Sequence, residues 1–171
     1  EYEALKFEKK IRIENISFQY NKNLPKILNK FSFEIVKGEK IAIKGQTGSG
    51  KSTLVNIISG LINPTEGRIL IDDTIIASEN LEQWQKNLSI VPQTVFLNDA
   101  TVLENIAIAH DVNSIDGKKA KNSAKIAQID TFIESLPEKY NEKVGERGVT
   151  LSGGQRQRIG IARALYRDSK V

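Results

Sequence analysis

One stretch of the sequence has the composition and spacing of a phosphate-binding loop, Gly45-Gln46-Thr47-Gly48-Ser49-Gly50-Lys51-Ser52, which matches the pattern G-x-x-x-x-G-K-[ST]. The glycines let successive backbone N–H groups converge on phosphate oxygens, and a following helix adds the positive end of its dipole. Lys51 is suited to pair with β- and γ-phosphates, and the Ser52 hydroxyl to bind Mg²⁺. An incidental glycine-rich turn is the other interpretation, but the predicted strand before it and helix after it favour the phosphate site.

A second string predicts another helix start that faces an anion, Leu151-Ser152-Gly153-Gly154-Gln155. Ser152 is a favourable N-cap residue, and the two glycines permit close approach to free backbone N–H groups. The string carries no lysine of its own, and in isolation it would indicate only a capped helix. Its start follows Lys51 by 100 residues.

The hydrophobic pattern predicts strands that alternate with helices, which indicates an α/β sheet. Two segments before Gly38 alternate apolar and polar residues, so we expect two half-buried edge or antiparallel strands there. A short apolar strand at 41–43 leads into the loop, and Gly60 and Pro64 stop the helix that follows. Further predicted elements are a strand at 68–71, a short helix at 81–88, a strand at 88–91, a mainly helical segment at 101–136 and a helix from Ser152 to about Tyr166.

Composition excludes several classes of chemistry. With no Cys and one His, the chain has no thiol nucleophile and almost no capacity for a zinc site. No apolar stretch reaches the roughly 18 residues that a membrane span requires. The net charge of +4 is compatible with nucleic acid or an anionic membrane surface as a partner, but the excess of positive charge is too modest to indicate one. The first residue is Glu1, and we interpret the chain as a piece of a longer protein.

The two strings and their spacing resemble the nucleotide-binding domain of ATP-binding cassette (ABC) transporters, whose signature motif LSGGQ continues here as RQRIGIARAL. The similarity covers essentially the whole chain. It implies an α/β fold, a P-loop NTPase (RecA-like) core with an N-terminal antiparallel β subdomain and a helical insert. We expect 1–100 to form the β subdomain and P-loop core, 101–150 the helical subdomain, and 151–171 the signature motif and the helix that follows it.

The resemblance also assigns ligand contacts outside the loop. Tyr20, in SFQY, resembles the aromatic residue that stacks on adenine, although a Tyr that ends a strand by itself indicates packing. Gln93, in VPQ, resembles the catalytic Q-loop glutamine, which contacts Mg²⁺ and senses the membrane domain. The expected ATP contacts are Tyr20, Gly45, Gln46, Thr47, Gly48, Ser49, Gly50, Lys51, Ser52 and Thr53, with Ser52 and Gln93 as Mg²⁺ ligands.

The resemblance further implies partners. Ser152, Gly153, Gly154 and Gln155 would meet, in trans, the γ-phosphate held by a second nucleotide-binding domain in a head-to-tail dimer. Gly145-Glu146-Arg147-Gly148 resembles the segment by which exporters contact their transmembrane domain, and is otherwise a charged surface turn. We therefore expect a domain that uses ATP and Mg²⁺, lies at the cytoplasmic face of the inner cell membrane, is fused to an upstream transmembrane domain, and powers export by ATP-driven dimerisation and hydrolysis.

Some features depart from the family pattern or only imitate it. Asp72 and Asp73 follow an apolar run as a Walker B aspartate would, but they precede the signature, so we interpret them as a turn. His110 also precedes the signature and cannot be the switch histidine. The sequence ends at Val171, before the expected Walker B strand and catalytic glutamate. We expect this 171-residue piece alone to be aggregation-prone and inactive as an ATPase.

The alternative is a soluble ABC ATPase that acts on nucleic acid or on the ribosome. DNA-repair relatives place a long coiled coil between the two motifs, and the interval here has no sustained heptads. The basic C-terminal helix is better interpreted as a solvated face, so we expect no nucleic-acid partner. Within the family, two strings are most similar to exporters of lipid-linked oligosaccharides, lipids or multiple drugs: Trp84-Gln85-Lys86 and Phe96-Leu97-Asn98-Asp99.

Overall fold

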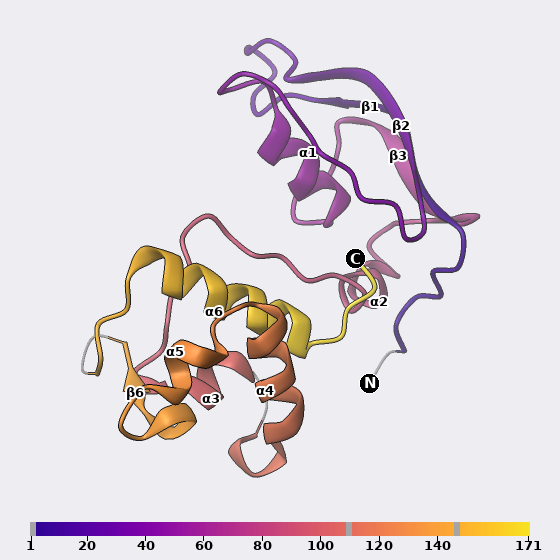
Figure 1. The fold of residues 1–171 in the computed structure, drawn as a ribbon. Coiled ribbons are helices and arrows are strands. Elements are labelled where there is room, and N and C mark those ends of the chain that lie inside the picture. Colours follow the sequence, from indigo (N-terminus) through magenta and orange to yellow (C-terminus); the bar gives the residue numbers. More distant parts are fainter. Residues whose placement is uncertain (1–2, 109–110, 146–147) are drawn as a thin grey trace. The chain divides into compact units, whose positions relative to one another are not determined.

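The structure, a computed structural model, describes residues 3–108, 111–145 and 148–171. The chain divides into two compact units, 1–88 and 89–171, which are described separately (Figure 1). Across these described ranges, no helix has the length and apolar character that a membrane crossing demands.

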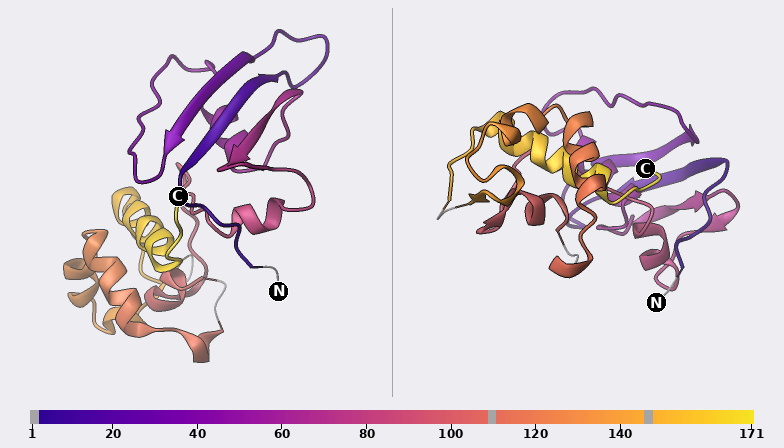
Figure 2. Two further views of the ribbon diagram at one scale, coloured as in Figure 1. Left: turned by 90° about the vertical axis from the view of Figure 1, so that its right-hand side faces the viewer. Right: turned by 60° about the horizontal axis from the view of Figure 1, so that its bottom comes forward.

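The first unit is built on a four-stranded antiparallel sheet in the order β2-β1-β3-β4, and the three longer strands lie side by side in the left view of Figure 2. Ile11 and Ile13 of β1 are buried and face partners in both neighbouring strands, which explains the alternating pattern in the sequence. The two predicted N-terminal strands are therefore confirmed as antiparallel. The strands are β1 (Lys10–Phe18), β2 (Leu28–Val36), β3 (Glu66–Ile71) and β4 (Thr74–Ile75).

Two helices complete the core of the first unit: α1 (Lys51–Ile58) and α2 (Leu81–Gln85). Leu54 and Ile57 of α1 pack in the same apolar cluster as the buried side of the sheet. Trp84 of α2 is fully buried, and its indole N–H donates to the carbonyl of Ile58 at 2.8 Å. This hydrogen bond satisfies an otherwise unpaired carbonyl at the end of α1.

The acidic pair after β3 forms a turn, as predicted. Asp72 adopts a left-handed backbone (φ 54°), and its carboxylate accepts the backbone N–H groups of Glu8, Lys9 and Lys10 at 2.9, 2.8 and 2.8 Å. Burial raises the pKa of Asp72, but the three backbone donors more than offset this, so the pKa lies below its ordinary value. The carboxylate thus anchors the start of β1 to the β3–β4 turn.

The second unit is mainly helical and confirms the helical segment predicted after residue 101. A two-stranded antiparallel pair, β5 with β6, borders it. Its elements are β5 (Ala100–Thr101), α3 (Val102–Ile106), the 3₁₀ turn η1 (Val112–Ser114), α4 (Gly117–Ile126), α5 (Asp130–Glu134), the 3₁₀ turn η2 (Lys139–Asn141), β6 (Lys143–Val144) and α6 (Gly153–Tyr166).

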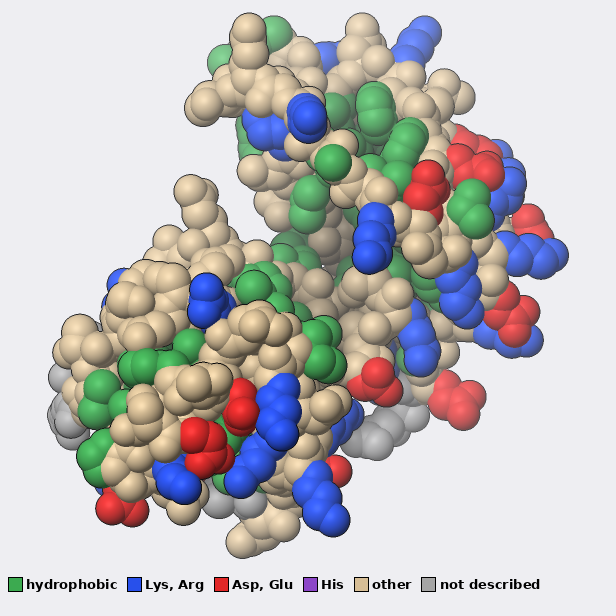
Figure 3. Space-filling view, viewed as in Figure 1, with side chains coloured by type: hydrophobic (Ala, Val, Ile, Leu, Met, Phe, Trp, Pro, Cys, Tyr) green, Lys and Arg blue, Asp and Glu red, His purple; other side chains and the backbone are tan. Residues whose placement is uncertain are grey.

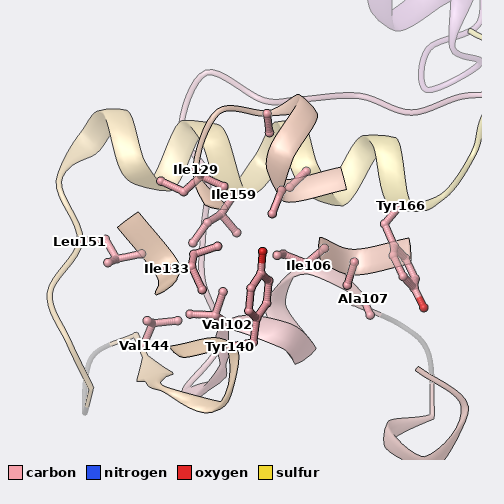
Figure 4. Packing of buried hydrophobic residues seen from close by; sticks show 14 residues of the cluster. Val102, Ile106, Ala107, Ile129, Ile133, Tyr140, Val144, Leu151, Ile159 and Tyr166 are labelled. Atoms are coloured by element: carbon pink, nitrogen blue, oxygen red, sulfur yellow. The ribbon is translucent and has the colours of Figure 1, made fainter. Parts of the chain in front are cut away.

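One apolar cluster holds these short helices together. Figure 4 shows Val102 and Ile106 from α3, Ile133 from α5 and Ile159 from α6 converging on the same space, with Tyr140 among them. Because helices of five residues are not stable alone, this shared burial is what stabilises them. The core therefore fixes the direction of α6, the helix that begins at the signature.

Two predicted strands are wrong. Residues 41–43 form no ladder with any described strand, and Ile41 and Ile43 are 39% and 43% exposed. An apolar run becomes a strand only where a partner strand lies beside it, and the described residues supply none here. Residues 88–91 are irregular: the Ser89 N–H donates to the carbonyl of Val171 at 2.9 Å, and no strand pairs with them in the described ranges. The predicted helix at 81–88 also ends earlier, at Gln85.

Asp72→Asn is expected to lower the free energy of unfolding by about 1.5–3 kcal/mol at pH 7, the range for hydrogen bonds to a charged group. Because the pKa of Asp72 is lower in the folded than in the unfolded protein, its stabilisation is present above the unfolded pKa of ~3.9 and is lost as pH falls through the folded pKa. Thermal unfolding at pH 7 and pH 3 measures both effects.

Asp73→Asn is the matched control, because the Asp73 side chain is 89% exposed and makes only a 3.3 Å ion pair with Arg12. It should change stability little. Equal losses for the two variants would refute the anchoring role of Asp72.

Candidate functional site

The glycine-rich loop makes a sharp turn into α1. Gly48 and Gly50 have φ of +81° and +91°, and Gly50 is the N-cap of α1 in the left-handed conformation. A Cβ at Gly50 would lie 2.7 Å from Ile27 Cγ2, so both the backbone angle and the space require glycine. The turn leaves the first N–H groups of α1 facing outward, which is the geometry that binds an anion.

Lys51 folds back across this loop. Its Nζ donates to the carbonyls of Gly45 and Gln46 at 2.8 and 2.7 Å, which places the ammonium charge inside the loop. A Cβ at Gly45 would lie 2.6 Å from Ser49 Oγ, so a larger residue at the start of the loop would force the Ser49 side chain to move. The charge and the outward N–H groups together can neutralise a multiply charged phosphate.

Tyr20 lies beside the loop. Its hydroxyl is 3.2 Å from Thr53 Oγ1, and its ring packs edge-on against Phe18 with 4.9 Å between centroids. Yet Tyr20 is 62% exposed, so much of its side chain is free of packing. A cavity of about 200 Å³ is lined by Tyr20, Ile27, Gly48, Gly50, Lys51, Ser52 and Thr53. An exposed aromatic face and a phosphate cradle on one cavity can bind a nucleotide by its base and its phosphates.

The signature string caps α6 as predicted. Ser152 is the N-cap, and its hydroxyl accepts the N–H of Gln155 at 3.2 Å while the Gln155 Oε1 accepts the N–H of Ser152 at 2.8 Å. This reciprocal pair is a capping box. Gly153 and Gly154 are exposed, and a Cβ at either would meet nothing within 4 Å. The helix start therefore has open space in front of its N–H groups.

Gln93 lies in an irregular, exposed segment of the second unit. The carbonyl of its neighbour Pro92 accepts a hydrogen bond from Gln157 Nε2 of α6 at 3.4 Å. The structure thus groups Tyr20 with the glycine-rich loop in the first unit, and the Gln93 segment with α6 in the second. Glu146, Arg147 and His110 lie outside the described residues.

Sequence reasoning missed two polar residues that shape the segment after Gln93, namely Asn105 and Arg163. Asn105 is fully buried, and Arg163 is half-buried with hydrogen bonds only to carbonyls. A polar residue at a core-facing helical position, beside the apolar Ile106, is the signal that could have revealed Asn105.

Comparison with known proteins agrees with this geometry. The family model described as "ABC transporter" matches residues 28–171. The ATP-dependent lipid A-core flippase of Chromohalobacter salexigens is 39% identical over 170 residues, covering 99% of this chain and 29% of the relative. A putative multidrug export ATP-binding/permease protein of Bacillus subtilis is 41% identical over 158 residues, covering 92% of this chain and 27% of the relative.

A solved structure, that of a bacterial Atm1-family ABC exporter with ATP bound, superposes with a TM-score of 0.87 at 38% identity, covering 98% of this chain and 29% of that one. The fold is that of a P-loop ATPase. The chain belongs to the ABC transporter family, as its motifs predicted, and is homologous to the ATP-binding part of ABC exporters. It spans less than a third of the length of these relatives.

Ser152→Ala is expected to destabilise the start of α6 by about 1 kcal/mol, because it removes the N-cap acceptor of the capping box. Gly154→Ala should leave this helix start as stable or slightly more stable, because the added Cβ meets nothing and Ala favours a helix. Hydrogen exchange of peptides that cover 150–159 measures the difference. Unchanged exchange in Ser152→Ala would contradict the capping role.

Proposed function

We propose that this chain is the ATP-binding and ATP-hydrolysing domain of an ABC exporter, in which ATP closes a dimer and hydrolysis reopens it. The observation that carries the proposal is the shared cavity of Tyr20 and the glycine-rich loop, on a chain homologous to ABC exporters. Adenine would stack on the free face of Tyr20, and the triphosphate would lie over residues 45–52.

The residues present fit Mg-ATP. The phosphates would take the N–H groups at the start of α1 and the ammonium of Lys51, which would exchange its carbonyl acceptors for phosphate oxygens. The Ser52 hydroxyl and the Gln93 amide are the proposed ligands of Mg²⁺, which supplies charge neutralisation at the β- and γ-phosphates. Thr53 would hold Tyr20 in place through their hydroxyl contact.

A second copy would complete each site. Ser152, Gly153, Gly154 and Gln155 are proposed to meet the γ-phosphate bound by the other chain. The open space before Gly153 and Gly154 and the positive end of α6, whose first turn has no acidic residue, support this role.

The remaining partner is proposed to be a transmembrane domain of the same protein, at the cytoplasmic face of the inner membrane. Relatives described as flippases and as an export permease support export rather than action on nucleic acid. On the face drawn in Figure 3, blue Lys and Arg side chains are interspersed with red Asp and Glu.

Lys51→Ala in the full-length protein should abolish measurable Mg-ATP binding, because the ammonium in the loop is removed. Tyr20→Ala should weaken ATP binding by about 1–3 kcal/mol, the range for base stacking on an aromatic ring. Calorimetric titration measures both. Tyr20→Phe is the control, since it keeps the ring and loses only the contact with Thr53.

Binding of Mg-tripolyphosphate separates the two roles. It should be lost in Lys51→Ala and kept in Tyr20→Ala, because tripolyphosphate has no base. Unchanged ATP affinity in Lys51→Ala would refute the phosphate-site assignment.

The signature residues are tested by mixing Lys51→Ala chains with Gly154→Asp chains, each inactive as a homodimer. In a head-to-tail dimer the mixed species has one site with both defects and one undamaged site, so ATPase activity should reappear on mixing. No recovery in verified mixed dimers would contradict the arrangement in trans.

A further inference from the structure

The segment that contains Gln93 contacts α6 at several points along the helix. The carbonyl of Pro92 accepts from Gln157, and a Cβ at Gly160 would lie 2.6 Å from Val95 Cγ2. Ser89 Oγ donates to the carbonyl of Ala164 at 3.3 Å. Contacts therefore follow the helix over successive turns, and the glycine at 160 permits the closest approach.

Arg163 adds two further hydrogen bonds to these contacts. Its Nε donates to the carbonyl of Asn105 at 2.9 Å, and its Nη2 donates to the carbonyl of Phe96 at 3.2 Å. Burial lowers the pKa of Arg163, and none of the ion pairs between described residues includes it. A half-buried charge without a carboxylate is costly, but the planar guanidinium holds two carbonyls at a fixed separation.

Asn105 extends these contacts to residues 98–101. Its side chain is fully buried, its Oδ1 accepts the N–H of Asn98 at 2.9 Å, and its Nδ2 donates to the carbonyls of Asn98 and Thr101, both at 3.0 Å. The amide thus binds both backbone groups of Asn98, as a paired strand would. Arg163 and Asn105 together define a brace from α6 to residues 96–101.

The braced loop carries Phe96, whose side chain is 80% exposed although its carbonyl is held by Arg163. A fixed main chain with a free side chain keeps residue 96 at a defined position relative to the signature end of α6. Neither Arg163 nor Asn105 belongs to the proposed ATP contacts, so their role is mechanical rather than catalytic.

We propose that Arg163 and Asn105 are positioning residues that make α6 and residues 93–99 move as one rigid body. When ATP binding displaces the signature, Gln93 and Phe96 are then displaced together with it. The transmission of an ATP-driven movement rests on the proposed function, whereas the rigidity of the brace does not.

The test is a distance measurement by electron paramagnetic resonance in the full-length protein, with spin labels at Phe96→Cys and Ile161→Cys. Both positions are exposed, and the chain has no native cysteine. Cysteines elsewhere in the full-length protein are replaced. One narrow distance distribution is expected, with no change on addition of Mg-ATP. Arg163→Gln and Asn105→Ala should each lose the single narrow peak.

Two further variants keep the test sharp. Tyr140→Phe removes, in the same unit, a 2.6 Å hydrogen bond to Asp130 that involves neither Arg163 nor Asn105, and should leave the peak narrow. Arg163→Lys keeps the charge but replaces the two donating nitrogens of the planar guanidinium, Nε and Nη2, with a single flexible ammonium, so it should broaden the peak partly even if Arg163→Gln does not fold.

A broad or ATP-dependent distribution in the labelled parent protein would overturn the proposal. So would a narrow peak retained in Arg163→Lys and Asn105→Ala. Mg-ATP binding by the unlabelled protein is measured separately, and its absence would refute the proposed function while leaving the brace intact.

Discussion

The left-handed backbone at Gly48 and Gly50 is the constraint on which the proposed site depends. It reverses the chain so that α1 starts at Lys51 with free N–H groups outward, beside the exposed ring of Tyr20. Because Ile27 already occupies the space a side chain at Gly50 would need, the turn is fixed by packing as well as by backbone angles. The sheet and the burial of Leu54 and Ile57 hold that helix in position.

In the second unit, the start of α6 is exposed to solvent although several of the helices in the unit are very short. Its apolar cluster supplies the stability that five-residue helices lack. The capping box satisfies the N–H groups of Ser152 and Gln155, and the space beside Gly153 and Gly154 is open. The first residues of α6 are therefore exposed, and the buried residues that pack it against the unit follow from Ile159 onward.

The sequence predicted those features that depend on local chemistry. The loop, the helix after it, the Ser152 cap and the Asp72 turn each follow from residues close in the chain. The strands at 41–43 and 88–91 failed because a strand needs a partner, which an apolar run alone cannot specify. Arg163 was missed because its partners are backbone carbonyls of distant residues, which no spacing pattern reveals. Asn105 bonds to backbone groups close to it in the chain, and its buried helical position beside Ile106 is the signal that was overlooked.

The central claim, that Tyr20 and the loop form one ATP site, is tested most directly by photolabelling the full-length protein with an azido-adenine analogue of ATP, followed by trypsin digestion and mass spectrometry. We expect the label on the tryptic peptide 13–22, which contains Tyr20, and its suppression by excess ATP. Labelling confined to other peptides, with 13–22 unmodified, would contradict the account.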